Sequence, residues 1–155
     1  MTDRTERAVL NHVIETCKDA ERGFRHIAEH ATDPALKSLF LDIASERARF
    51  AADLLPHAQR LGGANSHDGT TAAALHRTWI DLRSAISRGD AVAAIHEAER
   101  GEHFSRGVYN DALEGMLPPT TRELVETQSA ELRKTAERLS AELHKVKRLS
   151  DVAAS

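Results

Sequence analysis

The chain has 155 residues and a formal net charge of −3; 41% of its residues are hydrophobic and 29% are charged. A chain of this length forms about one domain, and this balance of apolar and charged residues excludes a disordered protein. Aromatic residues make up only 4%, so Ala, Leu, Ile and Val must fill the core, which suits packed helices better than a sheet. The net charge of −3 gives no indication of a strongly basic face, and we therefore expect no nucleic-acid partner.

Cellular context is constrained by what the sequence lacks. Its single cysteine, Cys17, excludes an intramolecular disulfide framework. Residues 1–6 are polar and charged rather than an apolar signal. No apolar run approaches the roughly 20 residues that a membrane-spanning helix needs. We therefore expect a cytoplasmic protein without a membrane partner.

The first predicted helix begins at Asp3 or Thr5 and has a single apolar stripe. Its apolar positions recur every three or four residues, as on one buried helix face, and include Leu10, Ile14, Cys17, Phe24 and Ala28. Residues 32–34 end this helix and begin the next. Asp33 is a favourable N-cap, and Pro34 stands where a missing backbone donor costs nothing.

The second predicted helix ends between residues 55 and 61, because Pro56 removes a backbone donor and clashes with the preceding turn. Its stripe comprises Leu36, Leu39, Ile43, Phe50 and Leu54. Residues 62–69 contain three glycines, and this composition predicts a loop. A third helix over about 70–88 would be roughly 28 Å long and would bury Leu75, Trp79, Leu82 and Ile86. We expect Trp79 to dock this helix on the others.

The fourth helix is predicted from about residue 91 to Met116, and the last helix follows Pro118 and Pro119, with a basic tail over 145–155 that frays after Leu149. Two helices, a long crossover over about 62–89 and two further helices form the connectivity of ferritin-like bundles. The sequence therefore predicts one all-α domain over residues 1–155, a ferritin-like four-helix bundle with a helical crossover between its second and third helices. Gly101 and Gly107 lie inside the fourth helix, where we expect them to let another helix approach closely.

Charged residues interrupt the apolar stripes near the middle of the helices. The fourth-helix stripe carries Glu99, Glu102 and Arg106 between apolar ends. The other helices contribute Glu21, Glu46 and Glu131. Counted from the turns, the acids fall at similar depths, and buried charges must be paired or bound to a metal. The sequence thus predicts that carboxylates from four helices meet at mid-bundle.

Four stretches carry a family resemblance: LNHVIETCKDAERGF, FLDIASERARFAADL, LHRTWIDLRSAI and EAERGEHFSRGVYNDAL. They resemble the bacterial domain-of-unknown-function 2383 family of four-helix-bundle proteins, in the ferritin-like superfamily, over about residues 8–138. This resemblance implies a ferritin-like bundle and no established reaction. If the protein is an enzyme, the superfamily resemblance implies iron-dependent oxygen or peroxide chemistry.

Di-iron proteins of this superfamily use one Glu from each of two helices and a Glu-x-x-His pair from each of the other two. The resemblance would make Glu21, Glu46, Glu131 and either Glu102 or Glu99 the ligands. The histidines depart from the pattern, because Arg49 follows Glu46 and Lys134 follows Glu131 at that spacing. An arginine cannot bind a cation.

Two interpretations of the acids remain open. In one, the carboxylates, with His103 or His96, bind iron or another divalent metal in a degenerate site. In the other, Arg47, Arg49 and Arg106 neutralise them. The protein would then be a non-catalytic helical module that acts by self-association or by binding a partner, for example in stress physiology. In either case we expect a homo-oligomer.

Overall fold

The computed structural model describes residues 2–62 and 72–154. Five helices form this part of the chain: α1 (Thr2–His30), α2 (Pro34–Arg60), α3 (Ala72–Ser87), α4 (Ala91–Glu114) and α5 (Pro119–Ala154). No strand occurs among these residues, so the all-α fold class is confirmed. No described helix is long and apolar enough to span a bilayer.

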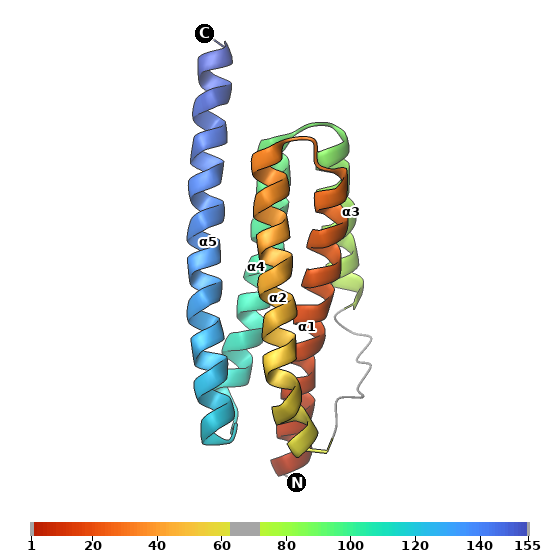
Figure 1. The fold of residues 1–155 in the computed structure, drawn as a ribbon, viewed down its shortest axis with the longest axis vertical. Coiled ribbons are helices and arrows are strands. Elements are labelled where there is room, and N and C mark those ends of the chain that lie inside the picture. The colour runs from red at the N-terminus through yellow and green to blue at the C-terminus, as the bar shows by residue number, and fades with distance from the viewer. Residues whose placement is uncertain (1, 63–71, 155) are drawn as a thin grey trace.

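The four long helices run along a common axis, and each packs against two others (Figure 1). α1 contacts α2 and α4, and α5 contacts α4 and α2, which closes a bundle. α3 packs on the outside, against α1 and α4. The predicted crossover also includes residues 63–71, which lie outside the described residues, so the ferritin-like connectivity stays a prediction.

Helix ends follow the local signals in the sequence. The Asp33 carboxylate accepts a hydrogen bond from the Ala35 backbone at 2.9 Å, and Pro34 begins α2. α2 continues through Pro56 to Arg60, inside the predicted window. One expectation was wrong: α5 remains helical to Ala154 instead of fraying after Leu149, and its end projects beyond the other helices (Figure 1).

α3 is docked through its tryptophan. The Trp79 ring lies edge-on to Phe24 of α1, with ring centroids 5.1 Å apart. A Cβ on Gly23 would stand 2.2 Å from the Trp79 indole, so only glycine leaves room for the ring. Leu82 is fully buried beside it. The side chain of Leu75 lies outside the described residues.

The glycines of α4 do not mediate a close helix approach. A Cβ on Gly101 would meet Thr78 at 3.4 Å, an ordinary contact, and a Cβ on Gly107 would meet no atom of the described residues within 4 Å. The expectation for these two positions was therefore wrong.

The core has two apolar clusters. One contains Phe24, Phe40, Leu82, Ile95 and Leu139. The other contains Leu10, Ile14, Phe50, Tyr109 and Leu132. Along α2, α4 and α5, polar residues separate the positions that belong to one cluster from those that belong to the other. We call four of them the polar layer: Glu46, Arg47, Glu102 and Thr135. The bundle thus places a group of polar side chains inside an otherwise apolar interior.

Candidate functional site: a buried arginine–glutamate layer

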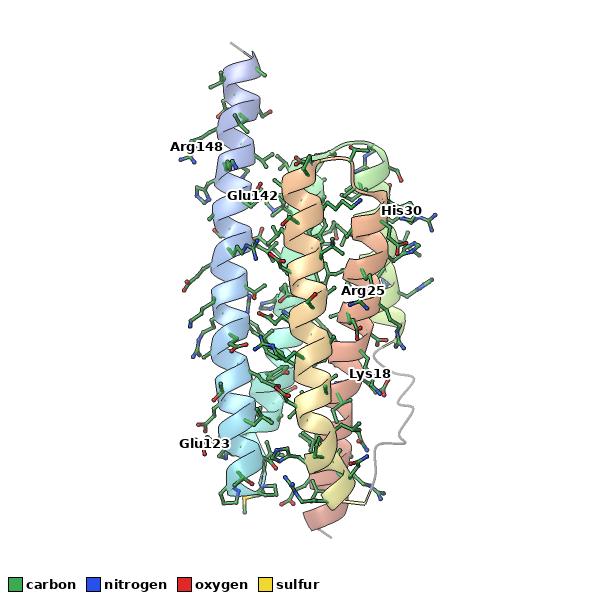
Figure 2. The ribbon with its side chains drawn as sticks, viewed as in Figure 1. Lys18, Arg25, His30, Glu123, Glu142 and Arg148 are labelled. Atoms are coloured by element: carbon green, nitrogen blue, oxygen red, sulfur yellow. The ribbon has the colours of Figure 1, made fainter. Side chains whose placement is uncertain are left out.

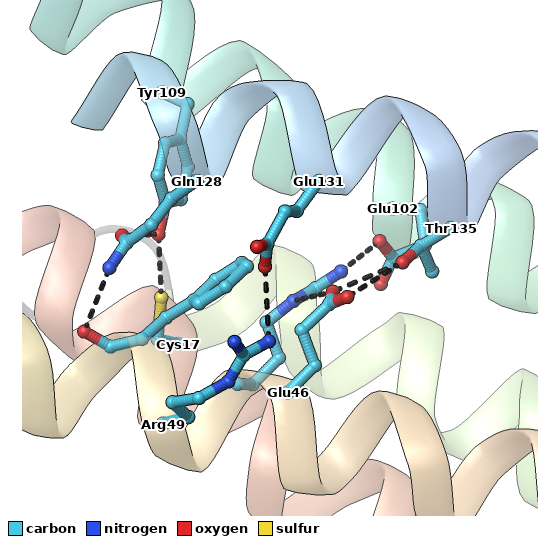
Figure 3. Close-up of polar contacts among 10 residues, drawn as sticks. Cys17, Glu46, Arg49, Glu102, Tyr109, Gln128, Glu131 and Thr135 are labelled. Carbon is cyan, nitrogen blue, oxygen red and sulfur yellow. Dashed lines mark hydrogen bonds and ion pairs between the residues drawn. The ribbon is translucent and has the colours of Figure 1, made fainter. Parts of the chain in front are cut away.

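The centre of the polar layer is an ion pair between α2 and α4. The Arg47 guanidinium donates from Nη2 to the Glu102 carboxylate (Figure 3). Each side chain is 1% exposed. Arg47 follows Ile43 by four residues and precedes Phe50 by three, so it continues the apolar stripe of α2 into the core. Helix periodicity therefore buries this arginine, and a carboxylate from another helix neutralises it.

Glu46 joins the same layer from the neighbouring position. Its Oε1 lies 3.3 Å from Arg47 Nε. Thr135 of α5 donates its hydroxyl to the Glu46 carboxylate, at 3.1 Å to one oxygen and 3.0 Å to the other. Burial raises the pKa of Glu46, although Arg47 and Thr135 act in the opposite direction. The layer therefore links α2, α4 and α5 through one guanidinium and two carboxyl groups.

The guanidinium is held in its charged form. Burial alone would lower the pKa of Arg47, but the charge and hydrogen bond of Glu102 together with the charge of Glu46 outweigh burial and raise the pKa above its ordinary value. Arg47 Nη1 and Glu102 Oε1 have no hydrogen-bond partner within the described part of the chain. The pair is neutralised in charge but incompletely hydrogen-bonded, and this limits what it adds to stability.

A second chain of buried polar contacts connects α1, α2, α4 and α5. Tyr109 donates its hydroxyl to Gln128 Oε1 at 2.7 Å, and Gln128 Nε2 donates to the Phe50 carbonyl at 3.3 Å. Cys17 Sγ lies 3.2 Å from the Tyr109 hydroxyl. Because the tyrosine has one proton and gives it to Gln128, the thiol must donate to Tyr109. Burial raises the pKa of Cys17 to about 11, so the thiol is protonated and unreactive at neutral pH.

The remaining predicted acids pair near the surface. Glu131 accepts from Arg49 at 3.0 Å, Glu21 accepts from Arg25 at 2.7 Å, and Glu99 lies 3.6 Å from His96. These carboxylates are between 24% and 33% exposed. His103 is exposed. Of the residues proposed as metal ligands, only Glu46 and Glu102 are therefore brought together around one group.

That group does not suit a divalent cation. Arg47 contacts both carboxylates, and its charged guanidinium offers donors only and repels a cation. Over residues 2–62 and 72–154, no three His, Cys, Asp or Glu side chains are grouped to hold a metal ion. The residues of the polar layer thus fit an ion-pair network better than a carboxylate metal centre.

A comparison with protein families matches residues 6–115 to the family described as Domain of unknown function (DUF2383). The chain belongs to this family. The match covers α1 to α4, so Arg47 and Glu102 lie within it and α5 lies beyond it. No curated protein matches the chain.

Sequence reasoning missed the central role of Arg47, which it named only as one of several possible partners. The signal that could have found it is the step from Ile43 to Arg47 to Phe50, which places the arginine on the buried face. It also offered Arg106, one turn from Glu102 on the same helix, as a neutralising residue, whereas Glu102 pairs with Arg47 of another helix.

Proposed function

We propose that this protein is a non-catalytic helical module that acts by self-association, and that its mid-bundle acids belong to an ion-pair network. The contact of Arg47 with Glu46 and Glu102 supports the second part, because it places a fixed cation among the carboxylates. The buried, protonated Cys17 thiol is no candidate nucleophile.

The polar layer serves to align the helices. Arg47 and Glu102 are both fully buried, so a shift of α2 by one turn relative to α4, across the bundle centre, would leave each charge facing apolar side chains. A buried polar pair of this kind can select one packing arrangement among several. In this proposal the layer fixes the register of the bundle.

The observation that carries the self-association proposal is the projecting end of α5 (Figure 1). Leu149 there is 62% exposed and Val152 is 73% exposed. A helix that extends past its own bundle offers surface to another protein rather than to its own core. The net charge of −3 favours a protein partner over nucleic acid, and we expect the protein to act in the cytoplasm.

The metal hypothesis stays as the competing proposal. A degenerate carboxylate site for iron or another divalent ion would need Arg47 to leave the layer, because its charged guanidinium would repel the bound cation. The resemblance to the ferritin-like superfamily is compatible with either proposal.

Light scattering coupled to size-exclusion chromatography tests self-association. The untagged chain of 17.0 kDa should show a mass above that of the monomer at about 100 μM. The measured mass should fall towards the monomer mass on dilution. A constant mass of 17.0 kDa across the dilution series would refute the proposal.

A further inference from the structure

The face of α5 that points away from the bundle carries a charged stripe. Its positions follow one another at steps of three and four, so they share one side of the helix. They lie opposite the buried Leu132, Leu139 and Leu143. We call this surface the outer stripe; it consists of Glu123, Glu126, Ala130, Lys134, Glu137, Ala141, Lys145 and Arg148.

Most of these charged side chains form no ion pair with another described residue. Glu126 pairs with Arg122 at 3.6 Å. Within the described residues, no ion pair involves the other charged members of the stripe. Figure 2 shows Glu123 and Arg148 near opposite ends of α5, both directed away from the other helices. The outer stripe is therefore available to another molecule.

The stripe has an internal spacing of eleven residues. Glu123, Lys134 and Lys145 are separated by eleven, and so are Ala130 and Ala141. Eleven residues in three turns give about 3.67 residues per turn, close to the α-helix itself, so the stripe stays on one side of a nearly straight helix. α5 is straight over its whole length in Figure 1. A second straight helix could follow the stripe from end to end.

The order of the charges is self-complementary when the second helix is antiparallel. In a register centred between residues 135 and 136, Glu123 faces Arg148 of the partner subunit and Glu126 faces Lys145 of the partner subunit. Towards the centre, Lys134 faces Glu137 of the partner subunit. Ala130 then faces Ala141 of the partner subunit, where small side chains let the helices approach. A parallel pair in register would place like charges together.

We propose that α5 forms an antiparallel homodimer through the outer stripe, with these ion pairs each made twice. The inference rests on the proposed self-association and names its surface. A favourable interaction of charged side chains with the helix dipole would explain the acids near the start of α5 and the bases near its end. They would not explain the matched Lys134 and Glu137 at the centre or the two alanines between the charges.

The size of the surface sets the expected affinity. From residue 123 to residue 148 the stripe is about 38 Å long. A footprint about 10 Å wide covers roughly 400 Å² on each chain, below the area of a standard stable interface. The dimer should therefore have a dissociation constant in the micromolar range and weaken as salt screens its exposed ion pairs.

Charge reversal with rescue tests this interface by sedimentation equilibrium at low salt. Glu123→Lys removes two attractive pairs and creates two repulsive ones, which should weaken dimerisation about tenfold or more. The double variant Glu123→Lys/Arg148→Glu should restore it, because each new lysine faces a new glutamate on the other chain. Residues 123 and 148 are too far apart along one helix to interact within a chain, so rescue reports a contact between chains.

Glu29→Lys is the matched control, since it reverses an exposed charge on α1 and should leave the dissociation constant unchanged. A monomeric wild-type protein would overturn the proposed self-association itself. A wild-type oligomer that Glu123→Lys leaves intact, or that the double variant fails to restore, would overturn the α5 interface while self-association stands.

Discussion

Removing the Glu102 carboxylate should destabilise the bundle more than removing any other predicted ligand. The Glu102→Ala variant leaves the guanidinium of Arg47, which is 1% exposed, with Glu46 as its remaining charged neighbour at 3.3 Å. Breaking a buried ion pair by deleting one partner costs about 3–5 kcal/mol. For a domain of this size that corresponds to a melting temperature lower by about 6–20 °C.

Urea unfolding followed by circular dichroism measures the loss, with two companion variants. Glu99→Ala removes a carboxylate on the same helix that is 33% exposed, and it should change the free energy of unfolding by less than about 0.5 kcal/mol. The double variant Arg47→Met/Glu102→Leu replaces the pair by apolar side chains and should recover most of the wild-type stability. A loss below about 1 kcal/mol for Glu102→Ala, or a double variant as unstable as the single one, would refute the reasoning.

Three further predictions concern the surroundings of the layer. Gly23→Ala should cost about 1–3 kcal/mol and shift the emission of Trp79, the only tryptophan, because the new Cβ would stand 2.2 Å from the indole. Gly107→Ala, where a Cβ meets no described atom within 4 Å, should instead stabilise the protein by up to about 1 kcal/mol. Equal effects of the two variants in unfolding titrations would contradict this contrast. Cys17, with its pKa raised to about 11 by burial, should react with a thiol reagent at neutral pH only at the rate of unfolding, and rapid labelling of the folded protein would count against its burial. Because burial raises the pKa of Glu46 above 4.5, the folded state binds this proton more tightly than the unfolded state, and stability falls as pH rises from 4.5 through the raised pKa. The free energy of unfolding of wild type minus that of Glu46→Gln should therefore be smaller at about pH 7 than at about pH 4. A larger difference at pH 7 would be inconsistent with the raised pKa.

The helices could be predicted from sequence because their signals are local. Asp33 and Pro34 define the start of α2 through neighbouring backbone groups alone. The fraying of α5 was mispredicted because the basic residues after Lys145 suggested a solvated tail, whereas helical propensity and the continuing packing of Val146 on the core favour a longer helix.

The site was predictable only in part, since its pairings span long distances in sequence. Periodicity located Glu46 and Glu102 at one level, which the polar layer confirms. It could not select Arg47 as the partner of Glu102, because the two residues are 55 positions apart and come together only when α1 and α5 hold α2 and α4 on opposite sides of the bundle centre. Gly23 was missed for the same reason: its role depends on Trp79 of another helix.

Metal binding by the untagged protein tests the central claim, that Arg47 rather than a cation neutralises the mid-bundle acids. Protein equilibrated with Fe²⁺, Mn²⁺ or Zn²⁺ and then dialysed should retain less than about 0.1 ion per chain by elemental mass spectrometry, with an unchanged melting temperature. Retention of about one or two ions per chain that the Glu102→Ala variant loses would contradict the account.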